Sequence, residues 1–289
     1  MEGICKLTGK KANLKQSHIY PKFAVDWLKE TGLKYLRRSS KPNIRNQDGK
    51  KLYLLSEEGE QLFSKSEKWF AERVFRPYLN DSSVKIDYDE NLFYFSISFL
   101  WRILMVHFIE EPGIKDFVNY EILVKAELEW RAFLYKGIYP KNFDRIHIFL
   151  TDRLKDHDLP YDNVDNYFTR ALHSTYVYNL KRNFLCVYGK FSRFMFFGLL
   201  GDCDESLLIN SKIFNSKGSI KMPQEMREPT IGNFLVNAIK KIESMPGPSS
   251  KQEKIIIDEI KRNYESFIKS DNYKSIFVDK AFLLKNKKQ

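Results

Sequence analysis

Three polar residues within the first 60 positions have side chains that can do chemistry on water or hold a cation. His18 lies in the segment Ser-His-Ile-Tyr-Pro, Asn43 follows a proline in a turn, and Glu60 stands at the start of an expected helix. An imidazole can take a proton near neutral pH, and a carboxylate oxygen suits a hard divalent cation. Each residue alone also has a structural explanation, as a turn residue or as an acid favoured by the helix dipole.

The segments that hold these residues are, in chain order, ICKLTGKKANLKQSHIYPKF, KPNIRNQDG and LLSEEGEQLF. Over residues 1–79 the chain resembles the HNH, or ββα-metal, endonucleases. The resemblance implies a hairpin and a helix around a scissile phosphate, with His18 as the general base and Asn43 orienting it. It also implies Glu60 as an oxygen ligand of Mg²⁺ or Mn²⁺. Ser17 departs from the family pattern, because a metal-binding Asp or His often stands before the histidine.

A structural zinc ion is not expected in this module. Many relatives in the HNH family hold zinc with two Cys-x-x-Cys pairs, and only Cys5 is present here. Thr8 occupies the position of the second cysteine, and Ser56 and Gly59 occupy those of the second pair. Hydroxyl groups do not replace thiolates in a tetrahedral zinc site at neutral pH. We expect apolar packing to hold the module together instead.

Basic residues are concentrated on the segment that carries these motifs. Residues 1–51 contain 13 Lys or Arg against 4 Asp or Glu, which gives +9 of the formal charge of +11. Such a cluster favours contact with a phosphate backbone, and a solvated lysine surface is the alternative. The residues predicted to contact DNA or RNA are Lys15, Lys22, Arg37, Arg38, Lys41, Arg45, Lys50 and Lys51.

The composition is that of a folded protein, because 43% of the residues are hydrophobic and 15% are aromatic. The 3 cysteines form no even disulfide framework and the N-terminus is polar, so we expect a cytoplasmic protein. The apolar run from Leu92 to Ile109 has the length of a membrane span but contains Arg102. A charge at that depth costs about 2.5–3.5 kcal/mol, so a buried core helix is the better interpretation and no membrane contact is expected.

The pattern of apolar residues predicts an α+β fold in two parts. Residues 1–79 are expected to form the HNH-like module, with a helix after Pro21, a strand at Leu52–Leu55, and a helix from Glu57 that Pro77 ends. The polar stretch Asn80 to Ser83 marks the expected boundary, and residues 80–289 are expected to form a larger domain. In that domain we expect helices at 92–110, 116–136 and 230–242, a long last helix from 250, antiparallel strands at 147–150, 175–178, 184–188 and 194–200, and a hairpin of 209–214 with 219–222.

The leading functional hypothesis is therefore nucleic-acid binding by an HNH-like module. This is either a metal-dependent endonuclease or a relative that has lost catalysis, and by analogy with the family it would belong to a bacterial defence system or a mobile element. The alternative is a non-catalytic interaction protein, in which residues 80–289 bind a protein partner and the N-terminal module is a scaffold.

Overall fold

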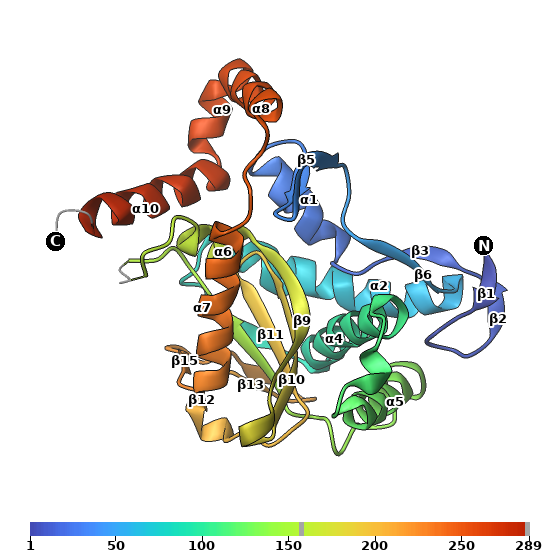
Figure 1. Cartoon of the computed structure of the whole chain (residues 1–289). Coiled ribbons are helices and arrows are strands. Elements are labelled where there is room, and N and C mark those ends of the chain that lie inside the picture. Colours follow the sequence, from blue (N-terminus) through green and yellow to red (C-terminus); the bar gives the residue numbers. More distant parts are fainter. Residues whose placement is uncertain (156–158, 287–289) are drawn as a thin grey trace.

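The computed structural model describes residues 1–155 and 159–286 and has the predicted α+β fold (Figure 1). At its centre lies a five-stranded antiparallel sheet in the order β13-β8-β11-β10-β9. Its strands are β8 (Ile146–Leu150), β9 (Leu172–Asn179), β10 (Phe184–Phe191), β11 (Phe194–Leu199) and β13 (Lys212–Ile213). The four predicted strands are thus confirmed, and they pair in one antiparallel sheet.

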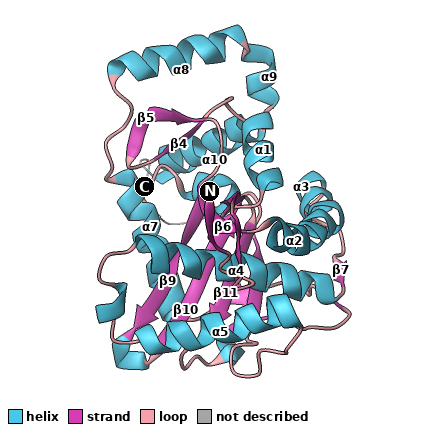
Figure 2. Cartoon of the chain, turned by 90° about the vertical axis from the view of Figure 1, so that its right-hand side faces the viewer, coloured by secondary structure: helices cyan, strands magenta, loops and turns pink. Residues whose placement is uncertain are grey.

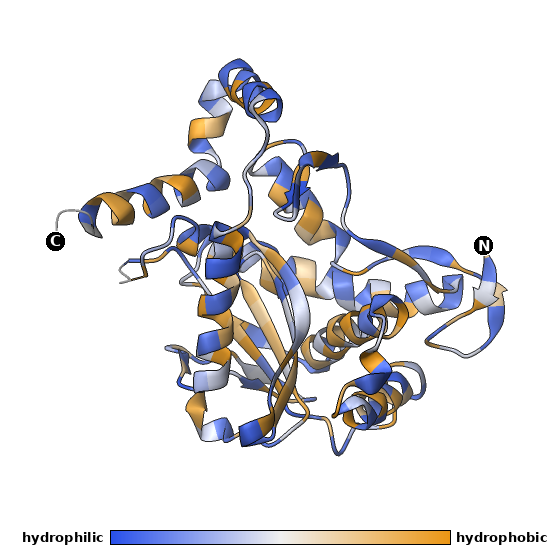
Figure 3. Ribbon diagram, viewed as in Figure 1, coloured by the Kyte–Doolittle hydropathy of each residue, from blue (hydrophilic) through white to orange (hydrophobic). Residues whose placement is uncertain are grey.

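Both faces of the central strands β10 and β11 are buried, which explains why these strands read as continuous apolar runs and do not alternate with polar residues. Leu185, Val187 and Phe196 face one apolar cluster, whereas Cys186 and Phe197 face another. Helix α4 (Glu90–Glu110) covers the first face, and α6 (Val164–Arg170) and α7 (Pro229–Glu243) lie on the second. Figure 3 shows α4 and the central strands as the most hydrophobic part of the ribbon.

Helix α4 is the core helix that the sequence predicted. It is long and apolar enough to cross a membrane, but 78% of its most apolar window is buried inside the protein. It approaches β10 so closely that a Cβ atom on Gly189 would lie 2.5 Å from Phe99. The one charge near its centre, Arg102, donates to the backbone oxygen of His18 and pairs with Glu67 at 2.7 Å. The buried charge is therefore neutralised by the N-terminal part of the chain.

The first 70 residues form small antiparallel pairs around two helices. The pairs are β1 (Glu2–Ile4) with β2 (Lys11–Asn13), β3 (Lys15–His18) with β6 (Lys51–Leu55), and β4 (Leu36–Arg38) with β5 (Lys41–Asn46). The helices are α1 (Lys22–Glu30), which begins after Pro21 as predicted, and α2 (Glu57–Phe70), which packs against α4. Figure 2 shows the β4–β5 pair standing apart from the central sheet.

Pro77 does not end the helix that begins at Glu57, so that prediction is wrong. Helix α2 continues through a π-helical turn, η1 (Ala71–Phe75), into α3 (Arg76–Asn80), where Pro77 lies in the first turn. In the wide turn the Arg76 N–H bonds to the Ala71 carbonyl. A proline is tolerated in the first turn of a helix, because its missing N–H would have no helical partner there.

The hairpin predicted for residues 209–214 and 219–222 is also wrong. Strand β13 pairs with the sheet strand β8, and β14 (Gly218–Ser219) pairs with β7 (Asp87–Tyr88). The edge of the central sheet offers unpaired backbone groups, and satisfying them outweighs a local turn. The remaining short elements are β12 (Leu208–Ile209) with β15 (Glu225–Met226), and the 3-10 turns η2 (Ile114–Asp116), η3 (Leu180–Arg182) and η4 (Glu205–Leu207).

Three helices replace the single long helix expected at the C-terminus. They are α8 (Ser250–Arg262), α9 (Tyr264–Lys269) and α10 (Asp271–Asn286), and the predicted helix at 116–136 is α5 (Tyr120–Lys136). Asp271, at the start of α10, joins this arm to the core by pairing with Arg153, Arg170 and Arg193. Helix α8 contributes no buried residue and lies above the β4–β5 pair in Figure 2.

The division into two domains near residue 79 stays a prediction, and the packing bears on it. One continuous cluster of buried apolar residues includes Cys5 and Phe63 from before the expected boundary, and Trp101 and Phe196 from after it. The rings of Phe63 and Trp101 lie 6.0 Å apart. The N-terminal part therefore shares its core with α4 and the sheet.

Candidate nucleic-acid interface

His18 ends strand β3, and its partner is a residue that the sequence analysis did not select. The imidazole Nε2 lies 3.1 Å from both carboxylate oxygens of Asp48, which also pairs with Lys51 at 2.5 Å. Partial burial acts to raise the pKa of Asp48, but hydrogen bonds from Lys51, the Gly49 N–H and His18 outweigh it and hold that pKa well below its usual range. Asp48 therefore stays ionised and fixes the orientation of the ring.

The three predicted catalytic residues do not converge. Glu60 accepts a hydrogen bond from Ser17. Neighbouring residues of a strand point to opposite faces, so Glu60 lies behind β3 and His18 in front of it. Asn43 accepts from the Ser249 N–H, just before α8, at 2.8 Å. The role predicted for Asn43, that of orienting His18, is filled by Asp48.

The described residues do not fit the divalent cation that the HNH resemblance implies. In residues 1–155 and 159–286, no group of three or more His, Cys, Asp or Glu side chains is arranged to hold a metal ion. Glu60, the predicted ligand of Mg²⁺ or Mn²⁺, is instead hydrogen-bonded to Ser17. A hard cation in a protein needs several oxygen ligands around one point, whereas Glu60 supplies a single carboxylate.

The four positions aligned with zinc ligands do come together. Hydrogen bonds join the Cys5 thiol to Thr8 and Ser56. A Cβ atom on Gly59 would lie 3.6 Å from the Cys5 sulfur. Burial acts to raise the pKa of the Cys5 thiol, but these hydrogen bonds outweigh it, so the net shift is downward. Residues 5 and 8 thus meet residues 56 and 59 at one point, although three of the four lack a thiol.

The eight predicted nucleic-acid contacts fall into two groups. Four are occupied by carboxylates: Lys15 by Glu57, Lys22 by Asp26, Lys50 by Glu110 and Lys51 by Asp48. The other four, on the β4–β5 pair, have no carboxylate within ion-pair distance in the described part of the chain: Arg37, Arg38, Lys41 and Arg45. Residues 36–46, which we call the basic hairpin, contain no acidic residue.

Arg37 is the most unusual of the four cations. Its Nε and Nη2 atoms are shielded from solvent and have no hydrogen-bond partner among the residues that the structure describes. Burial, together with nearby Arg45, outweighs the opposing effect of the Glu259 carboxylate and lowers the pKa of its guanidinium. A buried donor without a partner carries a desolvation cost that a bound acceptor would relieve. Arg37 is therefore a cation whose buried donors lack a partner within the described part of the chain.

The basic hairpin forms one wall of a cavity of about 680 Å³, which we call the basic cleft. Arg37 and Arg38 lie on this wall, and the opposite wall comes from α6, α7 and the start of β9. Lys241 of α7 projects from the far side and, like the hairpin cations, has no ion-pair partner among the described residues. The cleft thus has free positive charge on both walls.

Aromatic side chains and one histidine also line the basic cleft. Tyr20 donates to Ser174, and Tyr167 bonds through its hydroxyl to Nδ1 of His173 at 2.8 Å. Burial, with smaller contributions from Lys190 and Lys241, lowers the pKa of His173 to about 4. His173 is therefore a neutral hydrogen-bonding group at neutral pH.

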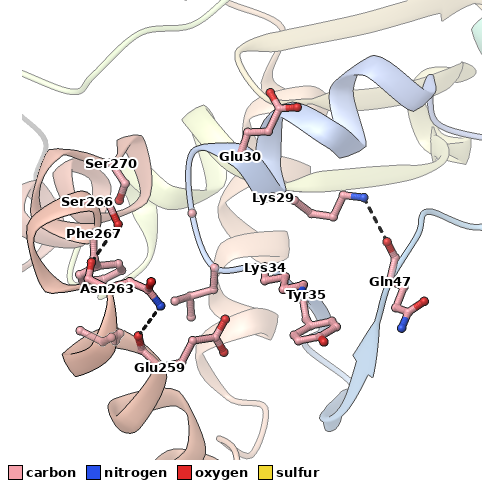
Figure 4. A pocket seen from close by; sticks show the side chains of 13 residues that line it. Lys29, Glu30, Lys34, Tyr35, Gln47, Glu259, Asn263, Ser266, Phe267 and Ser270 are labelled. Carbon is pink, nitrogen blue, oxygen red and sulfur yellow. Dashed lines mark hydrogen bonds between the residues drawn. The ribbon is translucent and has the colours of Figure 1, made fainter.

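A second cavity, of about 700 Å³, lies between α1 and the helices α8 and α9. Figure 4 shows Lys29 and Lys34 facing it together with Glu30 and Glu259. Lys29 is already bonded to the backbone oxygen of Gln47. Because its charges are balanced, this cavity suits an anion less well than the basic cleft does.

The cations of the hairpin wall were predicted from the sequence, whereas the residues of the opposite wall were not. Arg170, Tyr167, His173 and Lys241 are more than 100 residues from the basic hairpin, and no local pattern connects them to it. Asp48 could have been selected as a site residue from the sequence, because it lies in the Gln-Asp-Gly segment of the motif that contains Asn43.

Comparisons with family models, with curated proteins and with solved structures gave no match for this chain.

Proposed function

We propose that this protein binds nucleic acid through the basic hairpin. The observation that carries the proposal is the contrast among the eight cations. Four are neutralised by carboxylates, whereas Arg37, Arg38, Lys41 and Arg45 lie together without an ion-pair partner among the described residues. A phosphate backbone supplies closely spaced negative charges, and Arg and Lys are the residues that neutralise them.

The proposal predicts which basic residues contribute to binding. Replacing the four hairpin cations by alanine removes the phosphate contacts, so affinity for a labelled oligonucleotide should fall and its salt dependence should flatten. Each lost contact reduces the slope of log K against log salt by about 0.7 for single strands and about 0.9 for duplex DNA. A salt series of fluorescence anisotropy titrations measures both quantities.

A matched control comes from lysines that already have partners. Lys10, Lys11, Lys15 and Lys22 pair with Glu58, Glu2, Glu57 and Asp26. The quadruple alanine variant of this set removes the same charge and should leave the salt slope almost unchanged. An equal loss in both variants would show that net charge alone drives binding. Affinity that does not depend on salt in the wild type would contradict phosphate contacts and favour a protein partner for residues 80–289.

Phosphodiester hydrolysis is a second candidate function, favoured by the His18–Asp48 pair. Asp48 engages Nε2, and because an ionised carboxylate can only accept a hydrogen bond, Nε2 carries the proton and Nδ1 keeps the lone pair. A carboxylate that holds an imidazole in one tautomer is the arrangement of a general base. The meeting of positions 5, 8, 56 and 59 supports the HNH resemblance, and with it this candidate.

Hydrolysis is tested with supercoiled plasmid, linear DNA and RNA in the presence of Mg²⁺ or Mn²⁺. His18→Ala should lower the rate by roughly 10²–10⁴ and leave binding intact, because only the proton acceptor is removed. Asp48→Asn should lower the rate with the same substrates, whereas Asn43→Ala should not. Equal activity in wild type and His18→Ala, or no cleavage by either protein, would remove this candidate and leave the binding proposal standing.

A further inference from the structure

The two walls of the basic cleft come from distant parts of the chain and carry the same charge. Arg37 and Arg38 face it from the basic hairpin, and Lys241 faces it from α7. Asp48 also lines the cleft, but its carboxylate is already engaged by Lys51 and His18, so among the described residues Arg38 and Lys241 have no counter-ion of their own. An anionic group between the walls would contact Arg38 and Lys241 and would lie near the guanidinium of Arg37.

The size of the cleft limits what this anionic group can be. A cavity of about 680 Å³ lies in the range of small-molecule sites, roughly 300–1,000 Å³. Specific sites for duplex DNA instead spread over roughly 1,000–2,500 Å² of protein surface. The cleft therefore has room for one nucleotide unit and not for a stacked, paired helix.

The inner surface of the cleft suits a nucleobase. Tyr20 and Tyr167 are buried beneath it, and the partly exposed rings of Tyr35 and His173 line it together with aliphatic groups that include Ala238. Unstacked bases bind to aromatic faces, and a neutral imidazole can exchange hydrogen bonds with a base edge without adding charge. Arg170, which also lines the cleft, is held by Asp271 and is less available to a ligand.

We infer that the basic cleft takes one unstacked nucleotide, with its phosphate between Arg38 and Lys241 and its base on the aromatic side, so that the protein's preferred ligand is single-stranded nucleic acid. This inference rests on the proposed function and specifies its ligand. The basic hairpin, which extends from the cleft to Asn43 and α8, then holds the backbone on either side of the captured nucleotide.

The experiment compares an oligothymidylate with a blunt-ended duplex, using fluorescence anisotropy at one salt concentration. Wild-type protein should bind the single strand at least tenfold more tightly, because one stacked base contributes about 1–3 kcal/mol by alanine substitution. Thymidine monophosphate should compete with the oligothymidylate, since it carries the group that enters the cleft.

Two variants on α7 test the cleft itself, and each has a neighbour as its control. Ala238→Trp fills the cleft, whereas Asn237→Trp adds the same side chain at an exposed position on the same helix. Lys241→Ala removes the free cation of the far wall, whereas Lys240→Ala removes an exposed charge outside it. The first member of each pair should lose about tenfold in affinity for oligothymidylate, and its control should bind like wild type.

The outcomes separate this inference from the proposed function. Loss of binding in the hairpin variant, with normal single-strand binding by Ala238→Trp and Lys241→Ala, would overturn the cleft inference and leave the hairpin proposal in place. Duplex affinity equal to that for oligothymidylate would overturn it as well. Failure of the wild type to bind either nucleic acid would overturn both.

Discussion

Adding three thiols should create a zinc site, because positions 5, 8, 56 and 59 already meet. The perturbation is the triple variant Thr8→Cys, Ser56→Cys and Gly59→Cys, which adds three sulfurs to Cys5. A Cβ atom at position 59 would stand 3.6 Å from the Cys5 sulfur and 3.3 Å from the side chain of Leu55. The new side chain therefore fits if Leu55 moves by a few tenths of an ångström.

The expected size of the effect follows from what each substitution removes. Ser56 is the N-cap of α2, and its hydroxyl accepts from the Gly59 N–H, so losing it costs about 1 kcal/mol. Replacing Gly59 by cysteine should recover a few tenths of a kcal/mol, because glycine is a poor helix former. Zinc at a thousand times its dissociation constant stabilises the folded state by about 4 kcal/mol. The variant should be slightly less stable than wild type without metal and about 3 kcal/mol more stable with it.

Elemental analysis and thermal unfolding with zinc or with a chelator measure these two effects. The triple variant should hold one zinc per chain and unfold at a higher temperature with zinc, whereas wild type should hold well under one. Adding Cys5→Ala to the triple variant is the control, because it removes one of four ligands. Zinc binding that survives this control, or no zinc in the triple variant, would refute the assignment of these four positions.

Three further predictions concern stability. Arg102→Met should cost about 3–5 kcal/mol in chemical unfolding, because it leaves Glu67 and the His18 carbonyl without their buried partner, and Glu67→Gln should cost less; a neutral result for Arg102→Met would show that the ion pair contributes nothing net. Gly189→Ala should cost about 1–3 kcal/mol because its Cβ would overlap Phe99, and an unchanged unfolding midpoint would contradict the close helix-to-sheet packing. The folded-state pKa of His173 is lowered to about 4, so the free energy of unfolding is highest above pH 6.5 and decreases as the pH falls from 6.5 towards 4. Urea unfolding curves taken across this range measure the decrease. His173→Gln should remove this part of the pH dependence, which is of order 3 kcal/mol.

The sequence by itself determined the features that depend on near neighbours. The apolar spacing identified α4 and four of the five strands of the central sheet, since a helix or strand repeats its pattern within a few residues. The run of basic residues at 37–45 identified the four cations as predicted phosphate contacts, because they lie within one short segment, whereas their place on a hairpin came from the structure.

The tertiary structure decided which side chains meet. It gave His18 the partner Asp48 and placed Asn43 beside α8. It also paired Lys50 with Glu110 and left Arg37 unpaired, although both carry the same charge in the sequence. Pairing between elements far apart in the chain depends on how whole helices and sheets pack, and composition does not encode that. The far wall of the basic cleft, including Lys241, therefore became visible only in the folded protein.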